Sequence, residues 1–218
     1  MKIVISEKQF GHIIQKQMDE DYPTSWNIEY FKSLKTFKDR INYCQEHLKR
    51  ISSGTSRIVY MIDEQKVLKL AKNNKGILQN EIEIEHSGYY DLEDIVAKVF
   101  EYHDKGLWVE MELARKLTPK KFMEIMGFAF DDYAITLRIV DDEYKGKKSY
   151  LSKPKDYEAI IDHSFVNDVT SYMHGYDSPV GDLARMTSYG VVNRNGKDVV
   201  VLIDYGLTWD IYNTYYRR

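Results

Sequence analysis

Two aspartates late in the sequence could handle a phosphate group. Asp182 lies in a polar stretch, and Asp204 ends an apolar run that follows a turn at Asn195-Gly196. This order predicts a β-hairpin with both carboxylates at one end, where one can orient a hydroxyl and the other can hold Mg²⁺ on ATP phosphates. An aspartate before Tyr205-Gly206 is also an ordinary turn, so other features must support the chemistry.

A hairpin in the first half of the chain offers a cation for the same phosphates. The segments RIVYMI (57–62) and KVLKLA (66–71) alternate like strands around a short polar turn. Gly54 precedes them, and a glycine turn lets backbone N–H groups approach phosphate while Lys69 adds a point charge. One glycine does not make a glycine-rich loop, and a surface hairpin explains the same pattern.

A helix over residues 76–90 supplies a partner for this lysine. It carries glutamates at 81, 83 and 85, and a lysine partly removed from water stays charged best beside a carboxylate. Three alternating glutamates usually form a solvated face, so we expect at most one to pair with Lys69. Glu83 is preferred, 14 residues after the lysine, with Glu81 and Glu85 as alternatives.

The rest of the chain predicts an α+β protein. The first residues alternate as a short strand, and a later Thr118-Pro119 pair caps a helix. We expect helices at 6–19, 27–51, 120–128 and 157–173, further strands from 52, at 95–103, 106–113, 190–192 and 198–203, and a loop at 141–154.

The motifs occur in the order GTSRIVY, VLKLA, a glutamate-bearing helix, WVEMELA, GDL and LIDYGL. This order, over residues 51–208, resembles the protein-kinase-like superfamily, including small-molecule phosphotransferases and small phage-encoded kinase-like proteins. The resemblance implies that Gly54 belongs to a loop over the phosphates and that Lys69, held by Glu83, contacts them. It also implies a hinge from Glu112 to Ala114 that meets adenine through backbone groups.

By the same resemblance, Asp182 is the catalytic aspartate and Asp204 binds the metal. The family places a metal-binding asparagine five residues after the catalytic aspartate, but Thr187 stands there, and Ser188 is the best shifted match. A hydroxyl binds Mg²⁺ more weakly than an amide oxygen. Only 12 residues follow Gly206, too few for the peptide-docking helices of ordinary protein kinases.

Composition favours a protein of the cytoplasm. The net charge is only −3, which gives no strong nucleic-acid signal, and the lone Cys44 excludes an internal disulfide. No apolar run approaches the roughly 20 residues of a membrane helix, and the N-terminus does not look like a leader. Location in the host cytoplasm or a virion would follow from a phage origin.

The expected architecture is a two-lobed protein-kinase-like fold with an N-terminal strand and helical extension at 1–50. A sheet-bearing lobe would cover 51–114, and a reduced C-terminal lobe 115–218. The expected function is a phosphotransferase that binds ATP and Mg²⁺ and phosphorylates an unknown acceptor. The main alternative is a pseudokinase-like binding protein with a protein partner, and transfer of AMP is also open to this fold.

Overall fold

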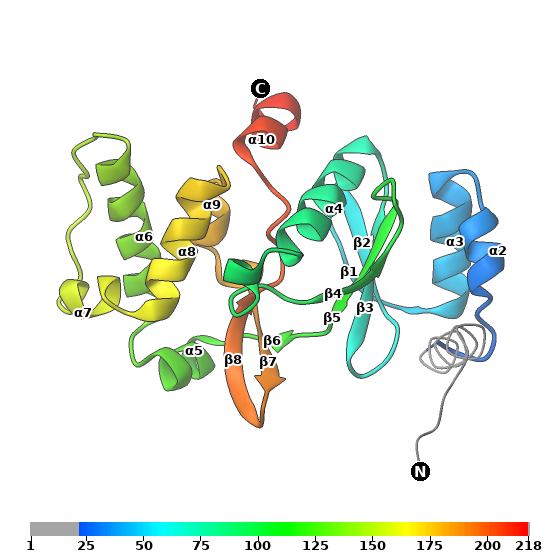
Figure 1. Ribbon diagram of the computed structural model, residues 1–218, viewed down its shortest axis with the longest axis horizontal. Coiled ribbons are helices and arrows are strands. Elements are labelled where there is room, and N and C mark those ends of the chain that lie inside the picture. Colours follow the sequence, from blue (N-terminus) through cyan, green and yellow to red (C-terminus); the bar gives the residue numbers. More distant parts are fainter. Residues whose placement is uncertain (1–21, 218) are drawn as a thin grey trace, which may run out of the picture.

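The computed structural model describes residues 22–217, which fold into two lobes (Figure 1). The opening strand and the helix expected at 6–19 lie outside the described residues. One lobe holds a five-stranded antiparallel sheet and one long helix, and the other holds most of the remaining helices and a three-stranded sheet. The fold is therefore α+β and two-lobed, as expected.

The larger sheet has the strand order β1-β2-β3-β5-β4. Its members are β1 (Lys49–Ser53), β2 (Arg57–Met61), β3 (Lys66–Ala71), β4 (Val99–Tyr102) and β5 (Trp108–Glu112). The hairpin of β2 and β3 and that of β4 and β5 are confirmed. The expectation of one helix over 27–51 is wrong, because two helices, α2 (Ile28–Ser33) and α3 (Phe37–His47), end before β1 begins. Thr36 caps α3, and its side chain accepts a hydrogen bond from the Asp39 backbone N–H.

Strand alternation divides the side chains of this sheet between two environments. Phe31 of α2 and Cys44 of α3 share a buried cluster with Tyr60, Leu68 and Trp108. Side chains two apart on a strand point to the same face, so the odd-numbered residues of β2, β3 and β5 face the other way. They include Arg57, Val59, Val67, Lys69 and Met111, all of which line a cavity between the lobes.

Helix α4 (Asn74–Ser87) packs against this second face (Figure 1). Asn73 caps it by accepting from the Gly76 backbone N–H. A Cβ added to Gly76 would lie 2.2 Å from the Ser56 carbonyl oxygen. The glycine thus lets the first turn of α4 touch the loop between β1 and β2, which fixes the helix relative to that loop.

The second lobe is built from α5 to α9 and a hairpin. Its elements are β6 (Arg115–Lys116), α5 (Pro119–Met126), α6 (Phe130–Tyr144), α7 (Tyr157–Ile161), α8 (Ser164–Gly175), α9 (Val180–Leu183), β7 (Tyr189–Arg194) and β8 (Lys197–Leu202). Two 3-10 turns, Tyr90–Leu92 and Met186–Ser188, and the last helix α10 (Trp209–Tyr215) complete the chain. Thr118 caps α5 as expected.

Two predictions for this lobe are wrong. The stretch 141–154 was expected to be a loop, but its first four residues continue α6, where Lys145 pairs with Asp141 at 2.7 Å. The single helix expected at 157–173 is interrupted at His163, whose extended backbone starts a new helix. No helix within residues 22–217 is both long and apolar enough to cross a membrane.

Candidate functional site

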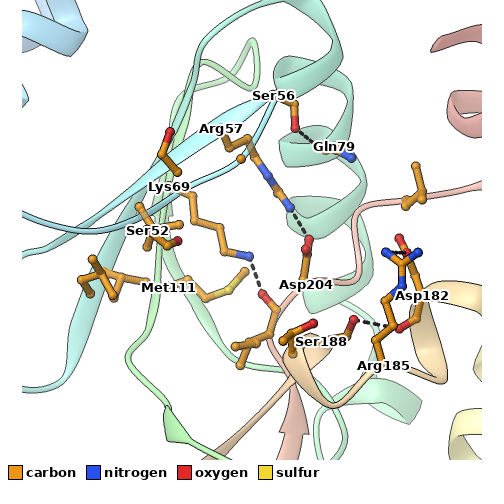
Figure 2. Close-up of a pocket in the computed structure, with 18 of the residues that line it drawn as sticks. Ser52, Ser56, Arg57, Lys69, Gln79, Met111, Asp182, Arg185, Ser188 and Asp204 are labelled. Carbon is orange, nitrogen blue, oxygen red and sulfur yellow. Dashed lines mark hydrogen bonds and ion pairs between the residues drawn. The ribbon is translucent and has the colours of Figure 1, made fainter. Parts of the chain in front are cut away.

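A cavity of about 700 Å³ lies between the two lobes. The end of β1, the loop 54–56, β2 and β3 form one wall, and Asp182, Ser188 and Asp204 lie on the opposite wall (Figure 2). Residues Glu112 to Ala114, the expected hinge, also line the cavity. This volume is in the range of pockets that bind small molecules and cofactors.

Lys69 of β3 is buried at the back of the cavity. Its Nζ lies 2.9 and 3.0 Å from the two carboxylate oxygens of Glu83 and also donates to the Ile203 carbonyl oxygen. Burial lowers the pKa of Lys69, while the Glu83 carboxylate acts in the opposite direction. Of the three glutamates considered, Glu83 is fully buried and paired, whereas Glu81 and Glu85 are exposed.

Arg57 of β2 is a site residue that the sequence reasoning missed. Its side chain is 9% exposed, and its guanidinium contacts Glu83 at 2.8 Å, Asn80 at 3.3 Å and the Asp204 carboxylate. Burial acts to lower the pKa of Arg57, but the charges of Glu83 and Asp204 outweigh it and raise the pKa above its ordinary value. Two cations and two carboxylates therefore meet at this point.

Asp204 follows β8, and close packing fixes the tripeptide that it begins. The Tyr205 ring is buried, and its hydroxyl donates to the Ala97 carbonyl oxygen at 2.9 Å. A Cβ on Gly206 would lie 2.2 Å from the Gln79 carbonyl oxygen of α4. Only a glycine allows this approach, and Asp204 is thereby held at the cavity with its side chain 58% exposed.

Asp182 lies in the short helix α9, on the cavity wall that also carries Asp204. Arg185 pairs with it at 3.0 Å, and the Ser188 hydroxyl donates to its backbone carbonyl oxygen at 2.7 Å. Burial and then the charge of Asp204 raise the pKa of Asp182, and Arg185 opposes this shift. A carboxylate with a raised pKa is a better proton acceptor than an ordinary aspartate.

The predicted hinge and phosphate loop also line the cavity. The Glu112 carboxylate accepts from Arg194 at 3.0 Å, and its backbone N–H donates to the Lys98 carbonyl oxygen at 2.8 Å, so neither of these groups is free for a ligand. Ala114 lines the same side. Gly54 does not have a positive φ, and a Cβ there would meet its nearest atom at 3.9 Å. The backbone at Gly54 thus does not itself require a glycine.

The C-terminal helix α10 contributes a wall that was not foreseen. Tyr212 and Tyr216 line the cavity and stack at 6.0 Å between ring centroids. Gln79 of α4 donates to the Tyr216 hydroxyl at 3.3 Å, and the Lys75 ammonium lies 4.1 Å from the centre of the Tyr216 ring.

The residues present fit a nucleotide better than a metal ion. Lys69 and Arg57 place an ammonium and a guanidinium at the cavity, and both groups can donate charged hydrogen bonds to phosphate oxygens. Of the predicted metal ligands, Asp204 pairs with Arg57 through one carboxylate oxygen, and Ser188 donates its hydroxyl hydrogen to the Asp182 backbone carbonyl oxygen. Within residues 22–217, no three His, Cys, Asp or Glu side chains gather as a metal site. Protein side chains alone therefore do not form a complete Mg²⁺ site, and phosphates and water would have to complete it.

No family model and no curated protein matches the sequence. Among solved structures, an ADP-bound aminoglycoside phosphotransferase, APH(2'')-Ib, aligns with 78% of this chain and 69% of its own, at 15% identity and a TM-score of 0.38. SAICAR-synthase from Saccharomyces cerevisiae, complexed with SAICAR, aligns with 81% of this chain and 77% of its own, at 12% identity and a TM-score of 0.38.

A ternary complex of APH(2'')-IIa with streptomycin and ATP covers 80% of this chain at 14% identity and a TM-score of 0.34. At such low identities and scores these likenesses say nothing about a substrate. The protein-kinase-like fold is assigned from the chain's own five-stranded sheet, the ion pair between Lys69 and Glu83, and the cavity between the lobes.

Proposed function

We propose that this chain binds ATP in the cavity between its lobes and transfers the γ-phosphoryl group to an acceptor hydroxyl. One observation carries the proposal: Lys69, which is paired with the buried Glu83, lines the same cavity as Asp182 and Asp204. A buried ion pair adds little net stability compared with apolar packing, so a buried ammonium–carboxylate pair beside a cavity is better explained by a ligand than by folding. Phosphate is the ligand that this charge pattern suits.

The proposed roles follow from position. Lys69 would contact the phosphates, the loop at Gly54 would cover them, and the backbone from Glu112 to Ala114 would meet the base. Asp182 would orient the acceptor hydroxyl and accept its proton. The acceptor oxygen then bonds to the γ-phosphorus as the bond to the bridging oxygen breaks, and ADP leaves with the negative charge. Positioning and electrostatics supply most of such catalysis.

The expected Mg²⁺ ion has a smaller role in this proposal than the sequence suggested. Mg²⁺ was expected at Asp204 and Ser188, and bound Mg²⁺ would neutralise phosphate charge. Because Asp204 is engaged by Arg57, no step proposed here depends on the metal. The division into an extension to residue 50, a sheet-bearing lobe at 51–114 and a reduced lobe at 115–218 is likewise proposed, as are the phage origin and a location in the host cytoplasm or virion.

A second candidate function is a pseudokinase-like protein that binds a nucleotide and acts through a protein partner. The pairing of Asp204 with Arg57 favours it, because a metal ion at Asp204 would have to displace that guanidinium or lie next to it. The two functions share the nucleotide site and differ in turnover. Asp182 is the residue that separates them.

Turnover of labelled ATP by wild type and Asp182→Asn is the test of phosphoryl transfer. We expect wild type to release ADP, with water as the minimal acceptor, and the variant to be slower by about 10²–10⁴-fold, the usual contribution of a general base. The carboxylate must be ionised to act, so wild-type turnover should fall as pH drops through its raised pKa, above the usual value of about 3.9.

Asp168→Asn, an exposed substitution on α8, is the matched control and should leave turnover unchanged. Equal turnover in wild type and Asp182→Asn would remove Asp182 from the mechanism. ATP binding without any ADP formation would instead establish the pseudokinase-like binding protein.

A further inference from the structure

The Arg57 side chain lines the proposed nucleotide cavity. It reaches from β2 toward Asp204 on the opposite lobe, beside the ammonium of Lys69 (Figure 2). The residue belongs to the same sheet face as Lys69, because the register pairs Val59 with Lys69 and Arg57 lies two residues before Val59. Both cations therefore point into the cavity from neighbouring strands.

The charges around Arg57 balance without a metal ion. Lys69 and Arg57 contribute two positive charges, and Glu83 and Asp204 contribute two negative ones. Glu83 contacts both cations at 2.8 to 3.0 Å, and Asp204 pairs with Arg57. A divalent cation brought to Asp204 would have to displace the guanidinium or lie next to it. Like charges at that separation repel, so Arg57 competes with a metal at Asp204.

Arg57 also has the capacity to bind phosphate. A guanidinium has five N–H donors, and the contacts to Asn80, Glu83 and Asp204 use three of them. Arginine matches phosphate oxygens in a planar, two-donor geometry and stays protonated at all relevant pH values. The end of β1 and the loop 54–56, which line the same cavity, place backbone groups nearby.

We propose that Arg57 is a built-in cation for the nucleotide's phosphates, which takes over charge neutralisation from a metal ion at Asp204. The chain then binds ATP in the absence of Mg²⁺. This inference rests on the proposed nucleotide site and adds to it the residue that meets the phosphates. Asp204 holds the guanidinium in position when the cavity contains no phosphate. When a nucleotide binds, the guanidinium contacts both Asp204 and the phosphates.

Titration calorimetry with ATP, in excess Mg²⁺ and in excess EDTA, tests this on wild type and on Arg57→Gln. Wild type should bind ATP in both buffers with dissociation constants within about tenfold of each other, a difference of about 1.4 kcal/mol. Arg57→Gln should lose more than about tenfold in EDTA, because a hydrogen bond between charged groups is lost. Arg57→Lys keeps the charge and should retain most of the binding in EDTA.

Arg50→Gln, on the exposed strand β1, is the control and should behave as wild type. Wild-type binding that requires Mg²⁺ would overturn the inference and leave the nucleotide site standing, and this comparison needs no variant to fold. Unchanged ATP affinity of Arg57→Gln in EDTA would also overturn the inference. Tighter ATP binding by this variant would overturn it too, because Arg57 would then obstruct access to Asp204. No binding of ATP in either buffer would instead overturn the nucleotide site itself.

Discussion

Glu83→Gln is expected to destabilise the folded chain by about 3–5 kcal/mol, the usual effect of removing one partner from a buried ion pair. The Glu83 side chain is fully buried and contacts both Arg57 and Lys69. Its loss leaves two buried cations with only the exposed carboxylate of Asp204 to balance them. Urea denaturation of wild type and variant measures the difference in the free energy of unfolding.

The matched control is Glu81→Gln, because Glu81 lies on the same helix and is exposed. We expect its free energy of unfolding to stay within about 0.5 kcal/mol of wild type, as for most surface substitutions. If Glu83→Gln were no more destabilising than Glu81→Gln, the charge cluster would not be held together as described.

Gly206→Ala is expected to weaken both folding and ATP binding. The new Cβ would lie 2.2 Å from the Gln79 carbonyl oxygen, a backbone atom that cannot rotate away. Either α4 or the segment at Asp204 must move, and forcing an extra carbon into a packed site costs about 1–3 kcal/mol. Movement of α4 also displaces Glu83 from Lys69, so the dissociation constant for ATP should rise. Thermal unfolding and an ATP titration report the two effects.

Gly175→Ala is the control for this change. Gly175 lies at the end of α8, and a Cβ there would meet nothing within 4 Å. The substitution should keep wild-type ATP affinity and should not lower the unfolding temperature. Unaltered stability and affinity in Gly206→Ala would mean that Asp204 is not positioned by contact with α4.

The sheet-bearing lobe was predictable where strands carry apolar alternation. The segments 57–62 and 66–71 alternate around a polar turn, and the structure pairs them as β2 and β3. Residues 49–51 of strand β1 were assigned to a helix and only its last two residues to a strand; all five residues are exposed, so no apolar pattern marks the strand. Its strand conformation comes from pairing with β2, a contact that local sequence does not encode.

Helix α6 was not predicted, and its last residues, from Asp141 on, were expected to form a loop because they are strongly charged. The preceding Leu137 and Ile139 are buried and carry the helix into that stretch. Tertiary packing thus overrode local composition at residues 141–144.

Within the site, the pairing of Lys69 with Glu83 followed from the order of the motifs. Arg57 did not, although strand parity could have revealed it. Once the hairpin pairs Val59 with Lys69, every second residue of β2 faces the same way as the lysine, and Arg57 is one of them. The pairing register of β2 and β3 was therefore the information that the prediction of Arg57 lacked. Tyr212 and Tyr216 reach the cavity only because α10 packs on α4, a long-range contact without a local signal.

The central claim is that ATP binds beside Lys69, and calorimetric titration of ATP into wild type and Lys69→Met tests it most directly. Arg57 still pairs with Glu83 in this variant, so the fold should survive and the comparison stays valid. The matched control is Lys98→Met, since Lys98 is 45% exposed. We predict binding by wild type and the control, and a loss of at least about tenfold in Lys69→Met, as expected for a lost charged contact. Equal ATP affinity in all three proteins, or no binding by wild type, would contradict the account.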